Sequence, residues 1–176
     1  MTVLTTARLT LAPPTAADLT HIMDLRTEPS VVQFMGGRAS TQEECWARLL
    51  KYVGHWSAFG FGYWMVRENQ TGRFLGEVGI AYQRRTNMPD GKDDPEAGWG
   101  LLPWARGKGY GNEALTAALD WSDRRFERTV CLIDPRNHPS LKLAALKGYQ
   151  PFGQTSLEGS PMSALERRWR TRDSTT

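Results

Sequence analysis

The stretch that decides the fold is EAGWGLLPWARGKGYGNEAL, residues 96–115. An apolar segment leads into a proline, a glycine-rich turn and a helix-like segment. Such a turn exposes the unpaired N–H groups of the first helical turn, and its glycines allow an anion to approach them. Arg106 and Lys108 add positive charge. The glycines of the turn are Gly107, Gly109 and Gly111. The stretch therefore predicts a binding site for a polyanion such as a pyrophosphate.

Two better-known phosphate-binding motifs match this turn poorly. A P-loop requires a Gly-Lys pair followed by Ser or Thr, whereas Lys108 is followed by Gly109. A dinucleotide-binding turn requires Gly-x-Gly-x-x-Gly, whereas the run that starts at Gly107 ends in Asn112. Asp134 lies at a distance that suits a ribose contact, but the β-α-β unit that should open such a fold is missing. The sequence thus disfavours both motifs.

Composition limits the classes of protein that the chain can belong to. The 176 residues are 40% hydrophobic and 23% charged, which predicts one globular domain over residues 1–176. The sequence has no signal-peptide pattern and no membrane-spanning run, so we expect a cytoplasmic protein without a membrane partner. Cys45 and Cys131 lie far apart and the histidines lack ligand spacing, so we expect no disulfide and no metal site.

Charge points weakly toward an anionic partner. The net charge of +3 permits such a partner without requiring one. The basic tail, about residues 170–176, is best interpreted as a solvated terminus, so we expect no nucleic-acid partner.

Hydrophobic periodicity predicts elements in the order β, α, α, β, β, β, α, β, α, β, β. The fold class is therefore α/β, a mixed single domain with a mostly antiparallel central sheet and flanking helices. The expected strands are residues 7–13, 61–68, 74–82, 96–102, 129–134, 149–159 and 160–169, and the expected helices are residues 15–28, 40–56, 111–126 and 137–149.

The helix predicted over residues 40–56 has two distinct signals. Ser40 followed by Glu43 predicts a capping box at its start. Its expected apolar stripe consists of Cys45, Trp46, Leu49, Leu50 and Val53.

The turn resembles a family signature. Arg106, Gly109 and Gly111 match the Arg/Gln-x-x-Gly-x-Gly/Ala pattern of the GCN5-related N-acetyltransferases (GNAT). NHPSLKLAALKGYQPFG, residues 137–153, resembles the next motif of that family, and ARLTLAP, residues 7–13, resembles the opening of its ribosomal-protein N-terminal alanine acetyltransferase (RimJ/RimL-like) branch. The resemblance covers residues 7–169 and implies transfer of an acetyl group from acetyl-CoA to an amine.

The resemblance also implies where acetyl-CoA would bind. In the family, the strand before the turn splays away from its neighbour and pairs with the pantetheine arm. That role would fall to the backbone of Gly100, Leu101 and Leu102. The pyrophosphate would meet the turn from Arg106 to Gly111, which consists of Arg106, Gly107, Lys108, Gly109, Tyr110 and Gly111. Asn137 would bind the pantetheine arm, or equally cap a helix.

Acyl transfer to an amine requires a group that takes a proton. Glu96 is the first candidate, at the Glu of the family's Glu-x-Gly-Tyr pattern, and Glu77 is the second. Either one could instead be a solvated charge at a strand end. Ala144 stands where many members have a Tyr that protonates the leaving thiolate. Ser140 could bind the departing sulfur or cap a helix, and release of the thiolate to solvent would need no acid.

The predicted function is acetyl transfer to a primary amine, such as a protein or peptide N-terminus, by direct attack. The alternatives are a non-catalytic acetyl-CoA-binding regulatory domain and acetylation of a small amine such as an antibiotic or polyamine. The family resemblance is compatible with a homodimer. Residues 36–61 and 84–95 are expected to choose the acceptor.

Overall fold

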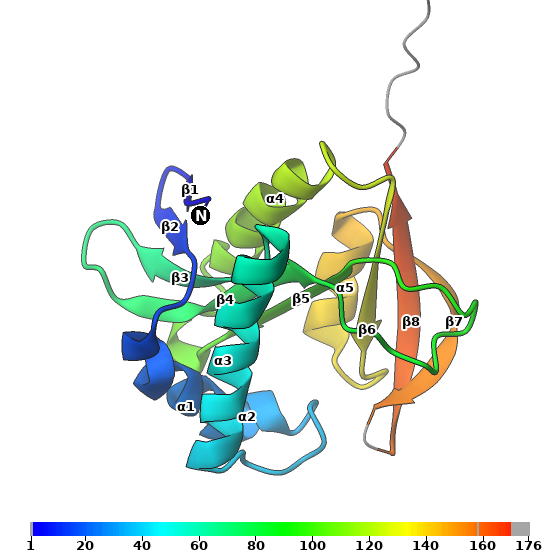
Figure 1. The fold of residues 1–176 in the computed structure, drawn as a ribbon, viewed down its shortest axis with the longest axis horizontal. Helices are drawn as coiled ribbons and strands as arrows, with labels where there is room; N and C mark the ends of the chain where they lie inside the picture. Colours follow the sequence, from blue (N-terminus) through cyan, green and yellow to red (C-terminus); the bar gives the residue numbers. More distant parts are fainter. Residues whose placement is uncertain (1, 158, 170–176) are drawn as a thin grey trace, which may run out of the picture.

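An eight-stranded sheet organises the chain, in a computed structural model that describes residues 2–157 and 159–169. The strand order is β1-β2-β3-β4-β5-β6-β8-β7 (Figure 1). Neighbouring strands are antiparallel except β5 and β6, which run parallel, so the predicted mixed and mostly antiparallel sheet is confirmed. The strands are β1 Leu4–Thr5, β2 Leu9–Ala12, β3 Tyr63–Glu68, β4 Phe74–Ala81, β5 Glu96–Leu101, β6 Arg128–Ile133, β7 Gln150–Leu157 and β8 Ser160–Arg168.

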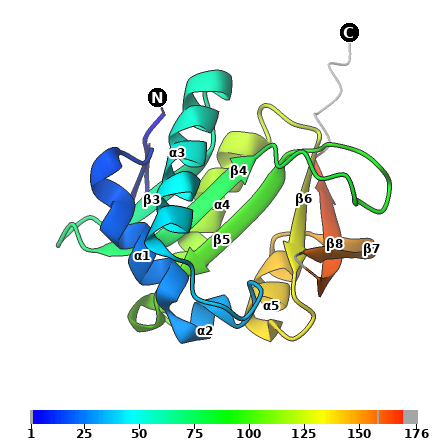
Figure 2. The ribbon, with the colours of Figure 1, turned by 60° about the horizontal axis from the view of Figure 1, so that its bottom comes forward.

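Helices cover both faces of this sheet. Figure 2 shows α1 and α3 in front of the sheet and α4 behind it. One core cluster joins α4 to the sheet, and a second joins α1 and α3 to the opposite face. Elements absent from the sequence prediction are β1, α2 and two short 3₁₀ turns, 16–18 and 103–105. The α-helices are α1 Leu19–Thr27, α2 Pro29–Val32, α3 Gln42–Phe59, α4 Tyr110–Ser122 and α5 His138–Leu146.

The start of α3 differs from its prediction by one residue. The capping box uses Thr41 and Glu44: the hydroxyl of Thr41 accepts the N–H of Glu44 at 3.2 Å, and Glu44 accepts the N–H of Thr41 at 2.8 Å. The predicted pair, Ser40 and Glu43, has the same chemistry and spacing. The local pattern therefore fits two registers, and the prediction chose the wrong one.

The apolar stripe predicted for α3 is only partly buried. Cys45 and Leu49 lie in the core, whereas Trp46, Leu50 and Val53 are 41%, 50% and 37% exposed. The rest of the buried face consists of Tyr52, His55 and Trp56. Both stripes have helical spacing, so only packing against the sheet decides which one turns inward.

Several absences concern the described part of the chain. No helix within it combines the length and the apolar character that a bilayer crossing requires. The same residues contain no group of three or more His, Cys, Asp or Glu side chains placed to hold a metal ion. The basic tail of the sequence prediction, residues 170–176, lies outside the described residues.

Candidate active site

The central feature of the site is the separation of β5 from β6. The two strands pair only at Glu96 and Val130, where the N–H of Val130 donates to the carbonyl of Pro95 at 3.0 Å. Beyond this bridge the strands diverge, and α5 lies beside the gap (Figure 2). Backbone groups of β5 on that side are therefore not paired with β6, which is the splay that the sequence predicted.

The register of β5 decides which residues turn their backbone toward this gap. The N–H of Leu102 donates to the carbonyl of Leu75 at 2.9 Å, toward β4. Because backbone direction alternates along an antiparallel strand, Gly100 also points to β4, and Trp99 and Leu101 point to the gap. Of the three predicted residues, only Leu101 turns its backbone to the gap, as Trp99 does, whereas Gly100 and Leu102 turn theirs to β4, since a strand offers only alternate residues to each side.

The glycine turn ends in an open helix N-terminus. Gly107 and Gly109 adopt φ of +73° and +81°, a left-handed region that favours glycine, and Gly109 is the N-cap of α4. The N–H groups of Tyr110, Gly111 and Asn112 donate to no other described residue. A Cβ atom on Gly111 would lie 3.3 Å from the side chain of Leu101. These N–H groups have no side chain of Gly109 or Gly111 in front of them, so they fit an anionic group such as a pyrophosphate.

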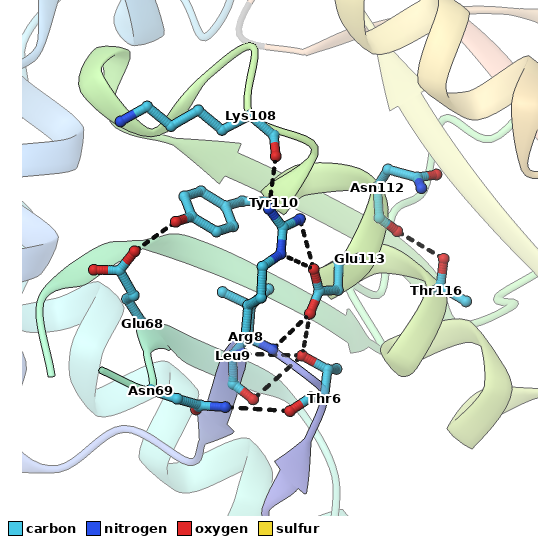
Figure 3. Close-up of polar contacts among 10 residues, drawn as sticks. All are labelled: Thr6, Arg8, Leu9, Glu68, Asn69, Lys108, Tyr110, Asn112, Glu113 and Thr116. Atoms are coloured by element: carbon cyan, nitrogen blue, oxygen red, sulfur yellow. Dashed lines mark hydrogen bonds and ion pairs between the residues drawn. The ribbon is translucent and has the colours of Figure 1, made fainter. Parts of the chain in front are cut away.

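The glycine turn is anchored to the connection between β1 and β2 (Figure 3). Arg8 donates to Glu113 at 2.7 Å and to the carbonyl of Lys108 at 3.0 Å. Glu113 also accepts the hydroxyl of Thr6 at 2.6 Å. Burial opposes ionisation of Glu113, but the bonds from Thr6 and Arg8 outweigh it and lower the pKa of the carboxyl. Glu113 therefore holds the helix start, and the hydroxyl of Tyr110 adds a bond to Glu68.

The other predicted donor-site residues have structural partners. Arg106 donates to the carbonyl of Leu101 at 3.0 Å and to the hydroxyl of Ser30 at 2.9 Å, so it links the end of β5 to α2. Asn137 is the N-cap of α5, where its side-chain oxygen accepts the N–H of Ser140 at 3.2 Å. The capping role is present for Asn137, and contacts of Arg106, Asn137 and Ser140 with acetyl-CoA stay predictions.

Glu96 begins β5 at the point where the gap opens. Its side chain is 10% exposed, and the guanidinium of Arg85 donates to both of its oxygens, at 2.6 and 2.9 Å. Arg85 belongs to the loop 82–95 that joins β4 to β5. Glu96 therefore lies beside the gap, with a partner from a surface loop.

Glu77 lies on β4, on the same face of the sheet, but deeper. It is 3% exposed and accepts bonds from Arg26 of α1 and from the hydroxyl of Tyr52 of α3. Its Oε2 atom and the Nε atom of Arg26 are buried without a hydrogen-bond partner among the described residues. Despite the opposing effect of burial, Glu77 keeps the pKa of Arg26 above its usual value. Glu77 thus joins the two helices to the sheet.

Sequence reasoning missed three residues of this face, Tyr63, Arg85 and Arg26. A signal was available for Tyr63 because Gly79 and Gly98 each interrupt a strand, and glycine within a strand often marks the close approach of another group. The ion pairs of Arg85 and Arg26 have no local signal, since their partners come from other elements.

Comparison with known proteins agrees with the family resemblance found in the sequence. Residues 8–150 match the Acetyltransferase (GNAT) domain family. The uncharacterized protein YkkB of Bacillus subtilis (strain 168) is 30% identical over 112 residues, which are 62% of this chain and 63% of YkkB. The chain thus spans less than two thirds of the length of that curated relative.

Solved structures extend the likeness to nearly the whole chain. A protein of Bordetella pertussis, assigned to the GnaT-family acetyltransferases, is 31% identical with a TM-score of 0.84, covering 95% of this chain and 99% of its own. An acetyltransferase of Agrobacterium tumefaciens str. C58 is 26% identical with a TM-score of 0.79, covering 96% and 95%. Enzymes of this family use acetyl-CoA as acyl donor. The chain therefore belongs to the GNAT family and carries its acetyltransferase domain.

Proposed function

We propose that the protein transfers an acetyl group from acetyl-CoA to a primary amine by direct attack, with Glu96 as the base. One observation carries the proposal: the gap between β5 and β6 opens at Glu96 and lies beside the bare N-terminus of α4. In this proposal, the binding surface for the donor and the proton acceptor would lie along one strand.

The donor surface follows from the backbone. Trp99 and Leu101 would pair with the amides of the pantetheine arm, and the N–H groups at the start of α4 would bind the pyrophosphate. When bound, acetyl-CoA supplies an acetyl group activated as a thioester. Trp99 and Leu101 also present side chains to the core beneath α4, so that face of β5 is closed by apolar packing.

Glu96 would take the proton that the amine loses. An amine attacks only in its neutral form, and an α-amino group has a pKa of about 8, against about 10.4 for lysine. A carboxylate beside the gap lowers the cost of losing that proton, directly or through water. An incoming ammonium group would carry the same charge as the guanidinium of Arg85, which now occupies both oxygens of Glu96.

A protein or peptide N-terminus is the first acceptor that we propose, because residues 7–13 resemble the opening of the RimJ/RimL-like branch. The fold alone does not choose the acceptor. RimL, a ribosomal-protein α-N-acetyltransferase, and a spermidine N-acetyltransferase of Vibrio cholerae are each 16% identical to this chain, with TM-scores of 0.75 and 0.72. A polyamine or another small amine is therefore the alternative.

A thiol-release assay tests the proposal. Purified protein receives acetyl-CoA and, in separate reactions, a peptide panel, polyamines, aminoglycosides and amino acids. Thiol release that depends on the acceptor supports the proposal, and the best acceptor names the substrate class. Calorimetric binding of acetyl-CoA without turnover of any amine would instead support a non-catalytic domain.

A matched pair of glycine variants locates the donor site in the same assay. Gly109→Val places a side chain at φ of +81° and 3.3 Å from Arg8, so we expect the affinity for coenzyme A to fall by about tenfold or more. Gly60→Val imposes the same strain at φ of +73°, with no atom within 4 Å of the added Cβ. Equal loss in both variants would contradict the proposed donor site.

A further inference from the structure

Tyr63 lies flat across two strands of the sheet. It pairs with Gly79 of β4, and Gly79 pairs with Gly98 of β5. A Cβ atom on Gly79 would fall 2.4 Å from the ring, and one on Gly98 would fall 2.1 Å from the hydroxyl oxygen of Tyr63. The two glycines therefore form a trough that carries a side chain of β3 across to β5.

Because of this trough, the hydroxyl of Tyr63 lies at the edge of the gap between β5 and β6. Gly98 is two residues beyond Glu96, on the same face of β5, and the pairing of β5 with β6 ends at Glu96. The ring of Tyr63 is held by stacking on Tyr52 of α3, with centroids 4.5 Å apart and planes 6° apart. The hydroxyl position is thus set by packing on both sides of the ring.

The hydroxyl of Tyr63 is available for a ligand. It makes no hydrogen bond to any other residue that the structure describes, although the side chain as a whole is 8% exposed. Burial, followed by the nearby Tyr52, Glu96 and Glu77, raises the pKa of Tyr63 well above its usual value, against a smaller opposing effect of Arg26. The group therefore stays protonated at neutral pH and can act as a donor.

We infer that Tyr63 is a further catalytic residue, whose hydroxyl donates a hydrogen bond to the departing sulfur. The inference rests on the proposed function, which places the acyl donor in the gap beside Gly98. It also accounts for Ala144, which is fully buried and supplies no hydroxyl where many family members have a tyrosine. A tyrosine from β3 would thus replace one from α5.

The proton balance closes within the site. The C–N bond forms, the C–S bond breaks, and the electron pair of the C–S bond goes to sulfur. The hydrogen bond from Tyr63 stabilises the negative charge on the sulfur, and Glu96 takes the proton that the amine loses. Transfer of that proton from Glu96 to the thiolate, directly or through water, restores the carboxylate and releases the product as a thiol.

Binding of coenzyme A tests the inference without turnover. Calorimetry compares coenzyme A with desulfo-coenzyme A, which lacks the sulfur, in the wild type and in Tyr63→Phe. We expect the wild type to prefer coenzyme A by roughly two- to tenfold, and Tyr63→Phe to lose that preference while binding desulfo-coenzyme A normally. In steady-state assays kcat should fall by about a hundredfold, with KM for acetyl-CoA unchanged.

Three further variants make the test specific. Tyr82→Phe removes a hydroxyl on the other face of the sheet and should behave as wild type. Gly98→Ala puts a methyl group where the hydroxyl lies and should cause the same loss as Tyr63→Phe, with a cooperative thermal melt confirming that the variant folds. Ser140→Ala tests the candidate from the sequence for the same role, because only one of the two hydroxyls can account for the preference for coenzyme A.

The outcomes separate the inference from the proposed function. A Tyr63→Phe protein that keeps both its rate and its preference for coenzyme A overturns the inference. So does a preference that disappears in Ser140→Ala but survives in Tyr63→Phe. A wild type that binds neither compound refutes the donor site itself, and with it the proposed function.

Discussion

Two glutamates on adjacent strands share one face of the sheet and one type of partner, yet their surroundings differ. Glu77 pairs with Arg26, and the two side chains are 3% and 6% exposed. Glu96 pairs with Arg85, and the two side chains are 10% and 20% exposed. Arg26 belongs to α1, which is packed in the core, whereas Arg85 belongs to a loop at the surface.

The difference separates a structural carboxylate from one that can react. A buried charge that loses its partner is strongly destabilising, so Glu77 cannot exchange Arg26 for a substrate at low cost. An ion pair that reaches solvent contributes little and can be exchanged. Of the two candidates that the sequence left open, the geometry therefore favours Glu96 as the base and Glu77 as an anchor of α1 and α3.

The largest expected effect separates the two carboxylates by rate. Glu96→Gln removes the proton acceptor but keeps the shape, so kcat should fall by about 10²- to 10⁴-fold, while the affinity for coenzyme A stays unchanged. Steady-state kinetics and calorimetry measure both quantities. A wild-type rate in Glu96→Gln would remove this residue from the mechanism.

The second largest effect is expected on stability, in a variant of Glu77. Glu77→Gln leaves Arg26 buried without a counter-charge, so the free energy of unfolding should fall by about 3–5 kcal/mol in urea titration. The folded fraction should retain most of its activity per molecule. Full stability combined with a rate loss of two orders of magnitude would exchange the roles of Glu77 and Glu96.

A smaller effect is expected from the loop arginine. Arg85→Gln removes a partner that keeps more contact with solvent than Arg26 does, so the free energy of unfolding should fall by roughly 1–2 kcal/mol. The matched variant Arg26→Gln should lose several times more, because its partner stays buried. Equal losses would show that the loop is as strongly anchored as α1 and would erase the contrast between the two pairs.

The smallest expected effect is the pH dependence of stability caused by His55, and it sets the pH range in which the variants are compared. His55 accepts the N–H of Tyr82 at 3.0 Å, and its other ring nitrogen contacts the carbonyl of Phe61 at 2.6 Å. Burial is the main cause that lowers the pKa of His55 below 6.5, although the Phe61 carbonyl opposes it. The unfolded chain therefore binds a proton first, and stability is lost as the pH falls below about 6.5.

Thermal melts between pH 7.5 and 5 check this linkage. The melting temperature of the wild type should decline across that range more steeply than that of His55→Gln, whose side chain does not titrate. Identical slopes would assign the acid sensitivity to other groups. Rates of the carboxylate variants are best compared above pH 7, where His55 is neutral in both states.

Local signals predicted most of the fold, including the glycine turn and the helix start where we propose that the acetyl donor binds. The glycines before α4, Pro139 in the first turn of α5 and Gly148 after it act on their immediate neighbours, so the sequence alone places those boundaries well. The ion pairs of the two candidate bases could not be predicted from local sequence. Arg85 lies eleven residues from Glu96, and Arg26 lies fifty-one residues from Glu77, so neither pair has a local pattern.

Sequence by itself determined the order of the longer strands and helices, the open helix start at residues 107–112 and the position of Glu96 at the head of β5, because each depends on residues that are close in the chain. Only the tertiary structure decided that Trp99 and Leu101, rather than Gly100 and Leu102, face the gap, and that Tyr63 reaches Gly98. These outcomes depend on strand register and on the packing of distant segments, which side-chain periodicity leaves open.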